Sequence, residues 1–170
     1  MKSIVKKPIA WEVCVLYLFT AVLALLIYQA LNQNIEFTLK PHALAMYTLY
    51  QMRFEYLPDV GYMETQGLFV IGRNCLGGKL FICLFSIFTI CRLSSYKSLR
   101  HKVGKVLSFC VISIVLAYFI TMIRIAASIP FCETPYFKLI HTILSLMIYF
   151  GAVLALYAFL CRSRGENDIE

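Results

Sequence analysis

Long apolar runs are the feature of this sequence that most limits its fold. About four of them approach membrane-spanning length, at residues 11–31, 76–91, 106–123 and 139–160. A helix needs about 20 apolar residues to cross the hydrocarbon core of a bilayer, where its backbone must satisfy its own hydrogen bonds. We therefore expect an all-α, polytopic integral membrane helix bundle that forms a single domain over residues 1–170.

The composition excludes the main soluble alternatives. Hydrophobic residues make up 61% of the chain and charged residues 15%, whereas about 25% of residues in a soluble domain are charged. The first apolar run is longer than the 7–15-residue core of a cleaved signal peptide, so we interpret it as a span. The second run is short and must either include residues around Cys75 or lie under a thinned or protein-covered surface. Basic residues flank the spans rather than forming a face on a soluble domain, which excludes nucleic acid as a partner.

The positions of the basic residues predict the orientation of the chain. Ten of the sixteen Lys and Arg residues lie in the N-terminal segment, the loop at 92–105 and the C-terminal segment. Cytoplasmic loops carry an excess of Lys and Arg. We therefore expect both termini in the cytoplasm, with segment 32–74 and the loop near 125–138 on the outer side.

The outer segment 32–74 is more than a linker. The stretch from Pro41 to Pro58 begins with a residue suited to a first helical turn and ends before another proline. Its aromatic, Met and Leu content predicts a helix that lies in the membrane interface or partly re-enters the membrane. The apolar run at 67–72 is too short to span and is expected to pack as a cap leading into Cys75. The segment's role stays open between a lid, a surface that reads the substrate, and an anchor.

This topology places three chemically capable residues at one outer depth. Cys75 lies at the outer mouth of the second span, Arg124 closes the third span, and His141 opens the fourth. A helix N-terminus or a nearby cation favours a cysteine thiolate. A histidine can act as general base for the thiol and general acid for the leaving amine. An arginine can stabilise the oxyanion of a tetrahedral intermediate. We therefore expect Cys75 as nucleophile, His141 as acid and base, and Arg124 as oxyanion or substrate stabiliser.

Neighbouring residues would complete a substrate site. Gly77 and Gly78 would let a substrate backbone approach closely, and Arg73 supplies a second cation beside Cys75. Each of these features also has a structural interpretation. A cysteine at a helix mouth often only packs, an arginine near a span end often reaches to lipid headgroups, and an interfacial histidine often serves as an anchor.

Other reactive side chains fit secondary roles. Cys132 lies on the outer side and could compete as nucleophile, while Glu133 could orient His141 or pair with Arg124. We expect His42 to be a surface residue and His101 to be solvated in the basic loop. The spacing of Cys and His matches no metal site, so we expect no metal and no cofactor.

The sequence resembles the exosortase/archaeosortase family of membrane-embedded cysteine transpeptidases, and is most similar to its compact bacterial form, exosortase K. That family is marked by a Cys followed closely by Gly, an Arg at the end of a later span, and a His opening the next. These residues occur here in "NCLGGKLF", "TMIRIAASIP" and "KLIHTILSL", with Cys75, Arg124 and His141. The resemblance covers about residues 67–151. The family pattern has Ser where this chain has Leu76, and often Asn where it has Thr121.

The resemblance implies a protease or transpeptidase in the bacterial cell (inner) membrane, with its active site facing outward. Its substrates would be exported proteins whose C-terminal sorting signal comprises a short motif, a hydrophobic helix and a basic tail. Cys75 would attack the peptide bond just outside the membrane and form a thioester, which an amine acceptor or water would resolve. A lipid-exposed groove between helices would admit the helix of the substrate.

Two other functions remain open at the level of sequence. One is a non-enzymatic membrane scaffold or transporter subunit, for which Cys75→Ala would be functionally silent. The near absence of charge from the middle of the spans disfavours an ion or solute pathway. The other is an inactive family member that retains the fold and lacks the chemistry.

Overall fold

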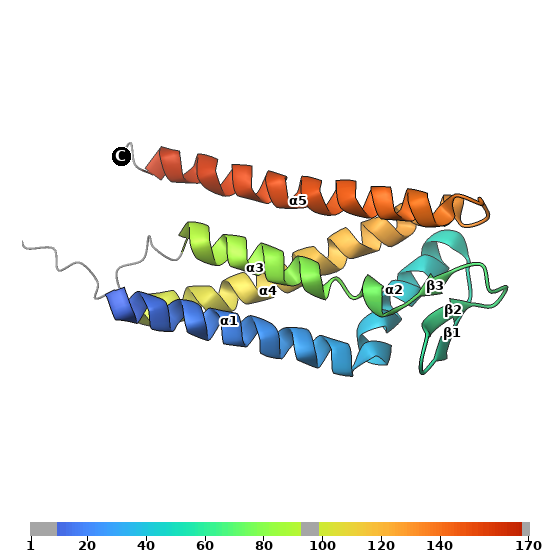
Figure 1. Ribbon diagram of the computed structural model, residues 1–170, viewed down its shortest axis with the longest axis horizontal. Coiled ribbons are helices and arrows are strands. Elements are labelled where there is room, and N and C mark those ends of the chain that lie inside the picture. Colours follow the sequence, from blue (N-terminus) through green and yellow to red (C-terminus); the bar gives the residue numbers. More distant parts are fainter. Residues whose placement is uncertain (1–9, 93–98, 168–170) are drawn as a thin grey trace, which may run out of the picture.

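Four long helices form the body of the protein (Figure 1). The computed structural model describes residues 10–92 and 99–167. The helices are α1 (Ala10–Gln33), α3 (Gly78–Arg92), α4 (Leu99–Ser128) and α5 (Phe137–Asn167). All four lie in segments long and apolar enough to cross a membrane, which confirms the prediction of a four-helix membrane bundle.

The second membrane-spanning segment reaches beyond its α-helix. It runs from Arg73 to Arg92, and begins with the 3-10 helix η1 (Arg73–Cys75) before α3. The segment that is apolar enough to cross a membrane therefore includes the residues around Cys75, in line with one of the two interpretations of this short run.

The helices α1, α4 and α5 surround α3, which packs against all three. Two stacked ring pairs mark this core: Phe81 with Phe85, at 5.8 Å between ring centroids, and Phe88 with Phe109 on α4, at 5.4 Å. In contrast, only 6% of the residues in the most apolar part of α5 are fully buried inside the protein. Large apolar side chains thus cover the outside of the bundle, as expected for helices that face lipid.

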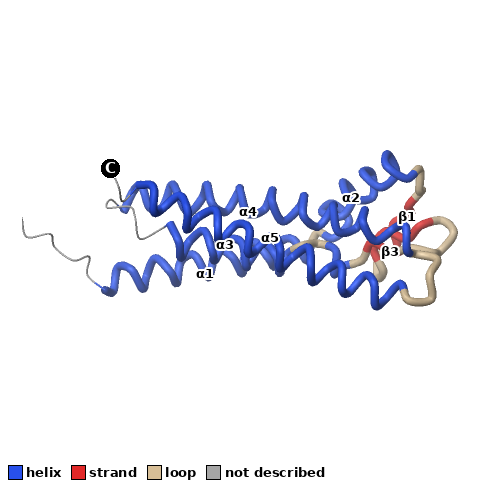
Figure 2. Tube along the Cα trace, turned by 90° about the horizontal axis from the view of Figure 1, so that it is seen from above, coloured by secondary structure: helices blue, strands red, loops and turns tan. Residues whose placement is uncertain are grey.

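The described ends of the chain lie together at one end of the bundle, and a small sheet lies at the other (Figure 2). An even number of spans requires this arrangement. The residues Lys2, Lys6, Lys7 and Lys97, which contribute to the predicted orientation, lie outside the described residues.

The outer segment differs from the predicted interfacial helix over residues 41–58. Helix α2 (Ile35–Tyr50) begins before Pro41 and includes it. The helix ends where Gln51 adopts the left-handed conformation, with a φ of 59°, and donates its backbone N–H to the carbonyl of Tyr47. Residues after it form strands instead of continuing the helix, so the predicted C-terminal half of this helix is wrong.

Three short antiparallel strands follow α2. They are β1 (Phe54–Leu57), β2 (Gly61–Glu64) and β3 (Val70–Ile71), in the order β1-β2-β3. The buried carboxylate of Glu64 accepts hydrogen bonds from the backbone N–H groups of Gln66 and Leu68, at 3.0 and 3.3 Å. Glu64 thus fixes the turn between β2 and β3.

A second apolar cluster joins the outer segment to the helices. It includes Leu39 and Met46 of α2, Ile71 of β3, Ile125 of α4, and Cys75. The apolar run at 67–72 contributes to this cluster, which confirms the prediction that it packs as a cap leading into Cys75. The sheet and α2 therefore position the residues around the cysteine.

Candidate active site

Cys75 is held at the junction between the outer segment and the bundle. It closes η1, and its backbone N–H donates to the carbonyl of Gly72 at 2.8 Å. Its side chain is 6% exposed. The thiol therefore lies in a fixed and largely apolar position, just before the first turn of α3.

Arg124 brings the candidate residues into one electrostatic environment. It projects from α4, is 5% exposed, and lies over the ring of Tyr149 with 5.2 Å from its guanidinium carbon to the ring centroid. It interacts electrostatically with both Cys75 and His141. The guanidinium is close enough to the thiol to donate toward it, although Nε and Nη2 form no hydrogen bond of standard geometry with any described residue.

His141 lies in the first turns of α5, where its ring contacts Phe137 at 5.6 Å between centroids. Its Nδ1 is buried and has no hydrogen-bond partner among the described residues. No hydrogen bond therefore fixes this nitrogen. The structure brings Arg124 to both Cys75 and His141, while the Cys75 thiol and His141 ring form no hydrogen bond with each other in the described chain. Catalytic hydrogen bonds are often loose in the absence of substrate.

The lack of side chains at Gly77 and Gly78 lets neighbouring helices pack closely against the start of α3. A Cβ on Gly77 would lie 2.5 Å from Oγ1 of Thr121, and one on Gly78 would lie 2.8 Å from the ring of Tyr28. Gly77 also has a φ of +68°, a conformation that favours glycine. The two glycines thus permit close packing of the start of α3 against α4 and α1, while both also line a pocket.

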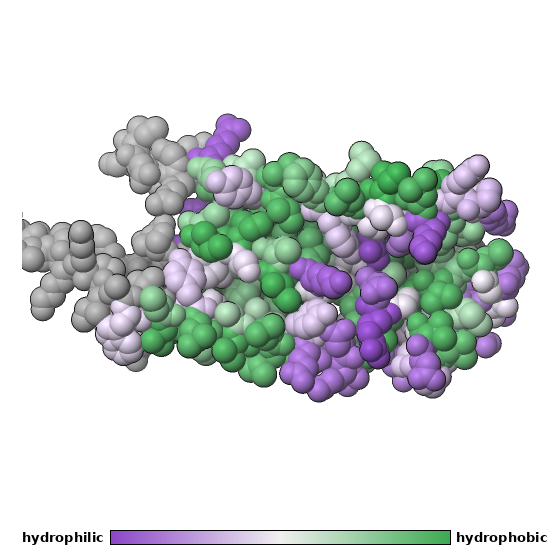
Figure 3. All heavy atoms as spheres, viewed as in Figure 1, coloured by the Kyte–Doolittle hydropathy of each residue, from purple (hydrophilic) through white to green (hydrophobic). Residues whose placement is uncertain are grey.

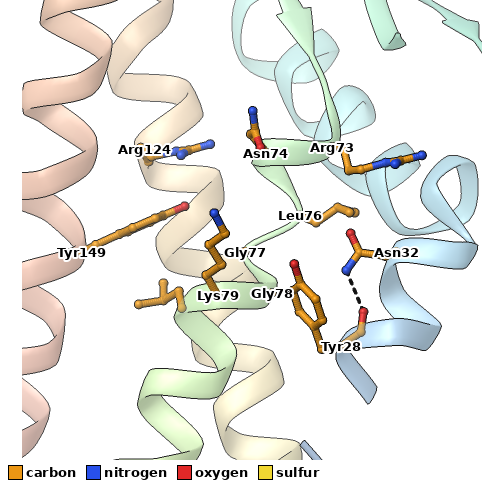
Figure 4. Close-up of a pocket in the computed structure, with 11 residues that line it drawn as sticks. Tyr28, Asn32, Arg73, Asn74, Leu76, Gly77, Gly78, Lys79, Arg124 and Tyr149 are labelled. Carbon is orange, nitrogen blue, oxygen red and sulfur yellow. Dashed lines mark hydrogen bonds between the residues drawn. The ribbon is translucent and has the colours of Figure 1, made fainter. Parts of the chain in front are cut away.

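That pocket has a volume of about 500 Å³ and opens between the start of α3 and the helices around it (Figure 4). Arg73, Lys79 and Arg124 supply its positive charges. Figure 4 shows Arg124 and Lys79 reaching into the same space, whereas Arg73 points away from Arg124 toward the opposite wall. Lys79 and Tyr149 were not predicted as site residues from the sequence.

The two departures from the family pattern have structural roles. Leu76 is buried in the cluster around Cys75 and lines the pocket. Thr121 is fully buried, and its hydroxyl lies 3.4 Å from that of Tyr149. Leu76 therefore makes this wall more apolar than a serine would, and Thr121 connects α4 to α5 beneath Arg124.

The position of His42 differs from the one predicted from the sequence. The prediction of a surface residue is wrong, because His42 is 1% exposed and its ring contacts Tyr118 at 4.5 Å between centroids. Burial and the charge of Arg124 lower its pKa from 6.5 to about 4, against the opposing effect of the nearby Thr38 and Tyr118 backbone. Neither ring nitrogen forms a hydrogen bond of standard geometry with a described residue.

The signal for this burial is present in the sequence. Leu39, His42, Ala43 and Met46 recur at helical spacing and form the buried face of α2. His101 is exposed, as predicted, although it lies in α4 rather than in a loop, and Glu133 is also exposed. Cys132 is half-buried and packs against the cluster that contains Cys75 and this face of α2. Within residues 10–92 and 99–167, no three His, Cys, Asp or Glu side chains gather as metal ligands would.

Comparisons of the chain with protein-family models, curated proteins and solved structures gave no match.

Proposed function

We propose that this chain is a membrane cysteine protease or transpeptidase that removes C-terminal sorting signals from exported proteins at the outer surface of the bacterial cell membrane. The observation that carries the proposal is the position of Arg124, a buried cation that interacts with both the Cys75 thiol and the His141 ring. The resemblance of these three motifs to the exosortase/archaeosortase family supports the same reaction.

The reaction assigns one task to each residue. His141 takes the proton of the Cys75 thiol, the thiolate attacks the carbonyl carbon of the scissile peptide bond, and Arg124 stabilises the negative charge that forms on the carbonyl oxygen. The carbon–nitrogen bond then breaks, His141 gives its proton to the leaving amine, and a thioester remains on Cys75. An amine or water then attacks the thioester and passes a proton to His141, the carbon–sulfur bond breaks, and His141 returns the proton to the Cys75 thiolate.

The substrate class follows from the same site. A sorting signal with a hydrophobic helix and a basic tail would place its peptide bond at the outer end of the bundle, beside the start of α3. The helix of the substrate would enter from the lipid, where the bundle exposes apolar surface.

The test is the fate of such C-terminal tails in cells. We would compare the C-termini of exported membrane proteins in cells that carry the wild-type chain, Cys75→Ser or Cys83→Ser. Cys83 is an exposed cysteine deeper in α3 and serves as the matched control. Wild type and Cys83→Ser should release the tails, whereas Cys75→Ser should leave them attached.

Arg124→Gln should reduce tail release by about 100-fold or more, the usual cost of losing an oxyanion donor. Immunoblotting of the membrane fraction would show that each variant accumulates to the wild-type level. Identical C-termini in wild-type and Cys75→Ser cells would overturn the proposal in favour of a scaffold or an inactive family member.

A further inference from the structure

The pocket at the start of α3 carries positive charge without a negative partner. Eleven residues line it, including Arg73, Lys79 and Arg124, and none of the eleven is an Asp or Glu. The first turn of α3 also lines it, and a helix N-terminus carries partial positive charge. The pocket is therefore electrostatically suited to an anion.

The buried side chain of Arg124 has no acidic partner among the residues that line the pocket. Its side chain is 95% buried, since 5% remains exposed, and it lines the pocket. Its Nε and Nη2 have no hydrogen-bond partner among the described residues. The Tyr149 ring offsets this buried charge only in part and accepts no hydrogen bond from Nε or Nη2, so a group from outside the chain that brings negative charge and acceptor oxygens would stabilise this site.

A separate apolar groove lies deeper along α1 and α3. It has a volume of about 350 Å³ and is lined by residues that include Ala21, Leu25, Ile82 and Phe85. On α3, Gly78 lines the pocket and Ile82, one helical turn further along the same face, lines the groove, so the two cavities follow one another along the helix. The cationic pocket lies at the sheet end of the bundle, and the apolar groove lies deeper in the span.

The space-filling view shows the same change of character on one face of the molecule. Hydrophilic side chains gather over its middle and toward the sheet end, and hydrophobic side chains cover the helices toward the chain ends (Figure 3). A ligand that fills both cavities must therefore be amphiphilic, with its anionic group at the outer end.

We infer that the α1–α3 groove binds one phospholipid, with its phosphate against Lys79 and Arg124 and one acyl chain along the apolar groove. Phosphate oxygens accept the charge-assisted hydrogen bonds that Lys and Arg donate. The hydrophobic helix and basic tail of a sorting signal carry no anion before the reaction begins, so charge complementarity favours the lipid. A substrate would displace the phosphate from Arg124 before the oxyanion forms there. The inference does not rest on the proposed activity, because binding requires neither Cys75 nor His141.

The experiment measures lipid binding by the full chain with the nucleophile removed. The Cys75→Ala variant would be purified in detergent, stripped of lipid, and titrated by native mass spectrometry. Three probes separate the contributions: dioleoyl phosphatidylglycerol has phosphate and tails, dioleoylglycerol has the tails alone, and glycerol phosphate has the headgroup alone. We expect one tightly bound phosphatidylglycerol, with at least about tenfold weaker binding of either other probe.

Variants locate the two parts of the site. Lys79→Gln should weaken phosphatidylglycerol binding by about tenfold, whereas Lys138→Gln, an exposed lysine outside the pocket, should leave it unchanged. Ala21→Phe should block the tail groove from an exposed position, and Val22→Phe, exposed on α1 outside the groove lining, is its control. Unchanged thermal unfolding would show that each variant is folded.

Two results would overturn the inference. Equal binding of glycerol phosphate and phosphatidylglycerol, with no effect of Ala21→Phe, would mean that the pocket takes free phosphate. Equal binding of phosphatidylglycerol and dioleoylglycerol, with no effect of Lys79→Gln, would mean that lipid only surrounds the helices. Because the measurement uses Cys75→Ala, loss of the proposed peptidase activity cannot produce either result.

Discussion

His42 is a neutral side chain held beside a buried cation. Its ring lies against Tyr118 on α4, and Arg124 is near enough to disfavour its protonation. The folded protein keeps its pKa at about 4, whereas its ordinary value is 6.5. Protonation of His42 would therefore place a second positive charge within range of Arg124.

This pKa difference predicts an acid-sensitive fold. Between pH 6.5 and 4 the unfolded chain takes up a proton on His42 and the folded chain does not. The contribution of neutral His42 to the free energy of unfolding is therefore complete above pH 6.5. About 3 kcal/mol of it is lost as the pH falls toward 4. His42→Phe, which keeps the aromatic contact, should flatten this dependence.

Thermal unfolding in detergent at pH 7.5 and pH 4.5 would measure the effect. His101→Gln is the matched control, because His101 is exposed on α4 and should leave the pH dependence intact. Equal losses of melting temperature in wild type and His42→Phe would contradict the assignment to His42.

At this scale the sequence was sufficient to select candidate residues but not to predict their surroundings. Cys75, Arg124 and His141 could be selected because topology placed them at one depth. The position of Arg124 over Tyr149 and its electrostatic effect on His42 could not be predicted, since both depend on how α2, α4 and α5 pack. Lys79 was missed because its position near the mouth of a span is equally suited to reaching lipid headgroups.

Among the elements, the junction before α3 is the most constrained. Gly77 has a positive φ and faces Thr121 of α4 on the side where any other residue would carry Cβ. A side chain at this position would both strain the backbone and separate α3 from α4.

Gly77→Ala should therefore lower the free energy of unfolding by about 1–3 kcal/mol. Gly151→Ala provides the control, because its added Cβ would meet no atom within 4 Å in α5. Combining Gly77→Ala with Thr121→Ala should recover part of the loss by removing the nearest atom. Equal melting temperatures for Gly77→Ala and Gly151→Ala would exclude this role for the junction.

The long helices were predictable because lipid imposes a length and a composition on them. The outer segment was less predictable than these helices. Pro41 suggested a helix start, yet α2 begins at Ile35 and accommodates the proline. The helix end depends on Gln51, a residue that seldom adopts the left-handed conformation. The strands are short, from 2 to 4 residues, and their pairing depends on turns at Gly61 and Gly67.

For the whole molecule, the structure separates two ends with different character. The described chain ends gather at one end of the bundle, and α2 with its sheet covers the other (Figure 2). The excess of Lys and Arg near the chain ends predicts that this end faces the cytoplasm.

Cysteine labelling would test this orientation. In a chain with its own cysteines replaced, Gln66→Cys in the exposed turn after β2 should react with an impermeant maleimide in intact cells. A cysteine added after Glu170 should react only once the membrane is opened. The reverse pattern would invert the predicted topology, and the fold would be unaffected.

Helix α5 carries His141 at the end nearest the sheet, and few of its residues are fully buried, although one side of it packs against α3 and α4. In a bilayer, acyl chains would cover the other side of the helix. We therefore expect the thickness of the bilayer to influence the tilt of α5 and with it the distance from His141 to Cys75. We therefore expect the position of His141 to differ between preparations of this protein in different detergents or lipids.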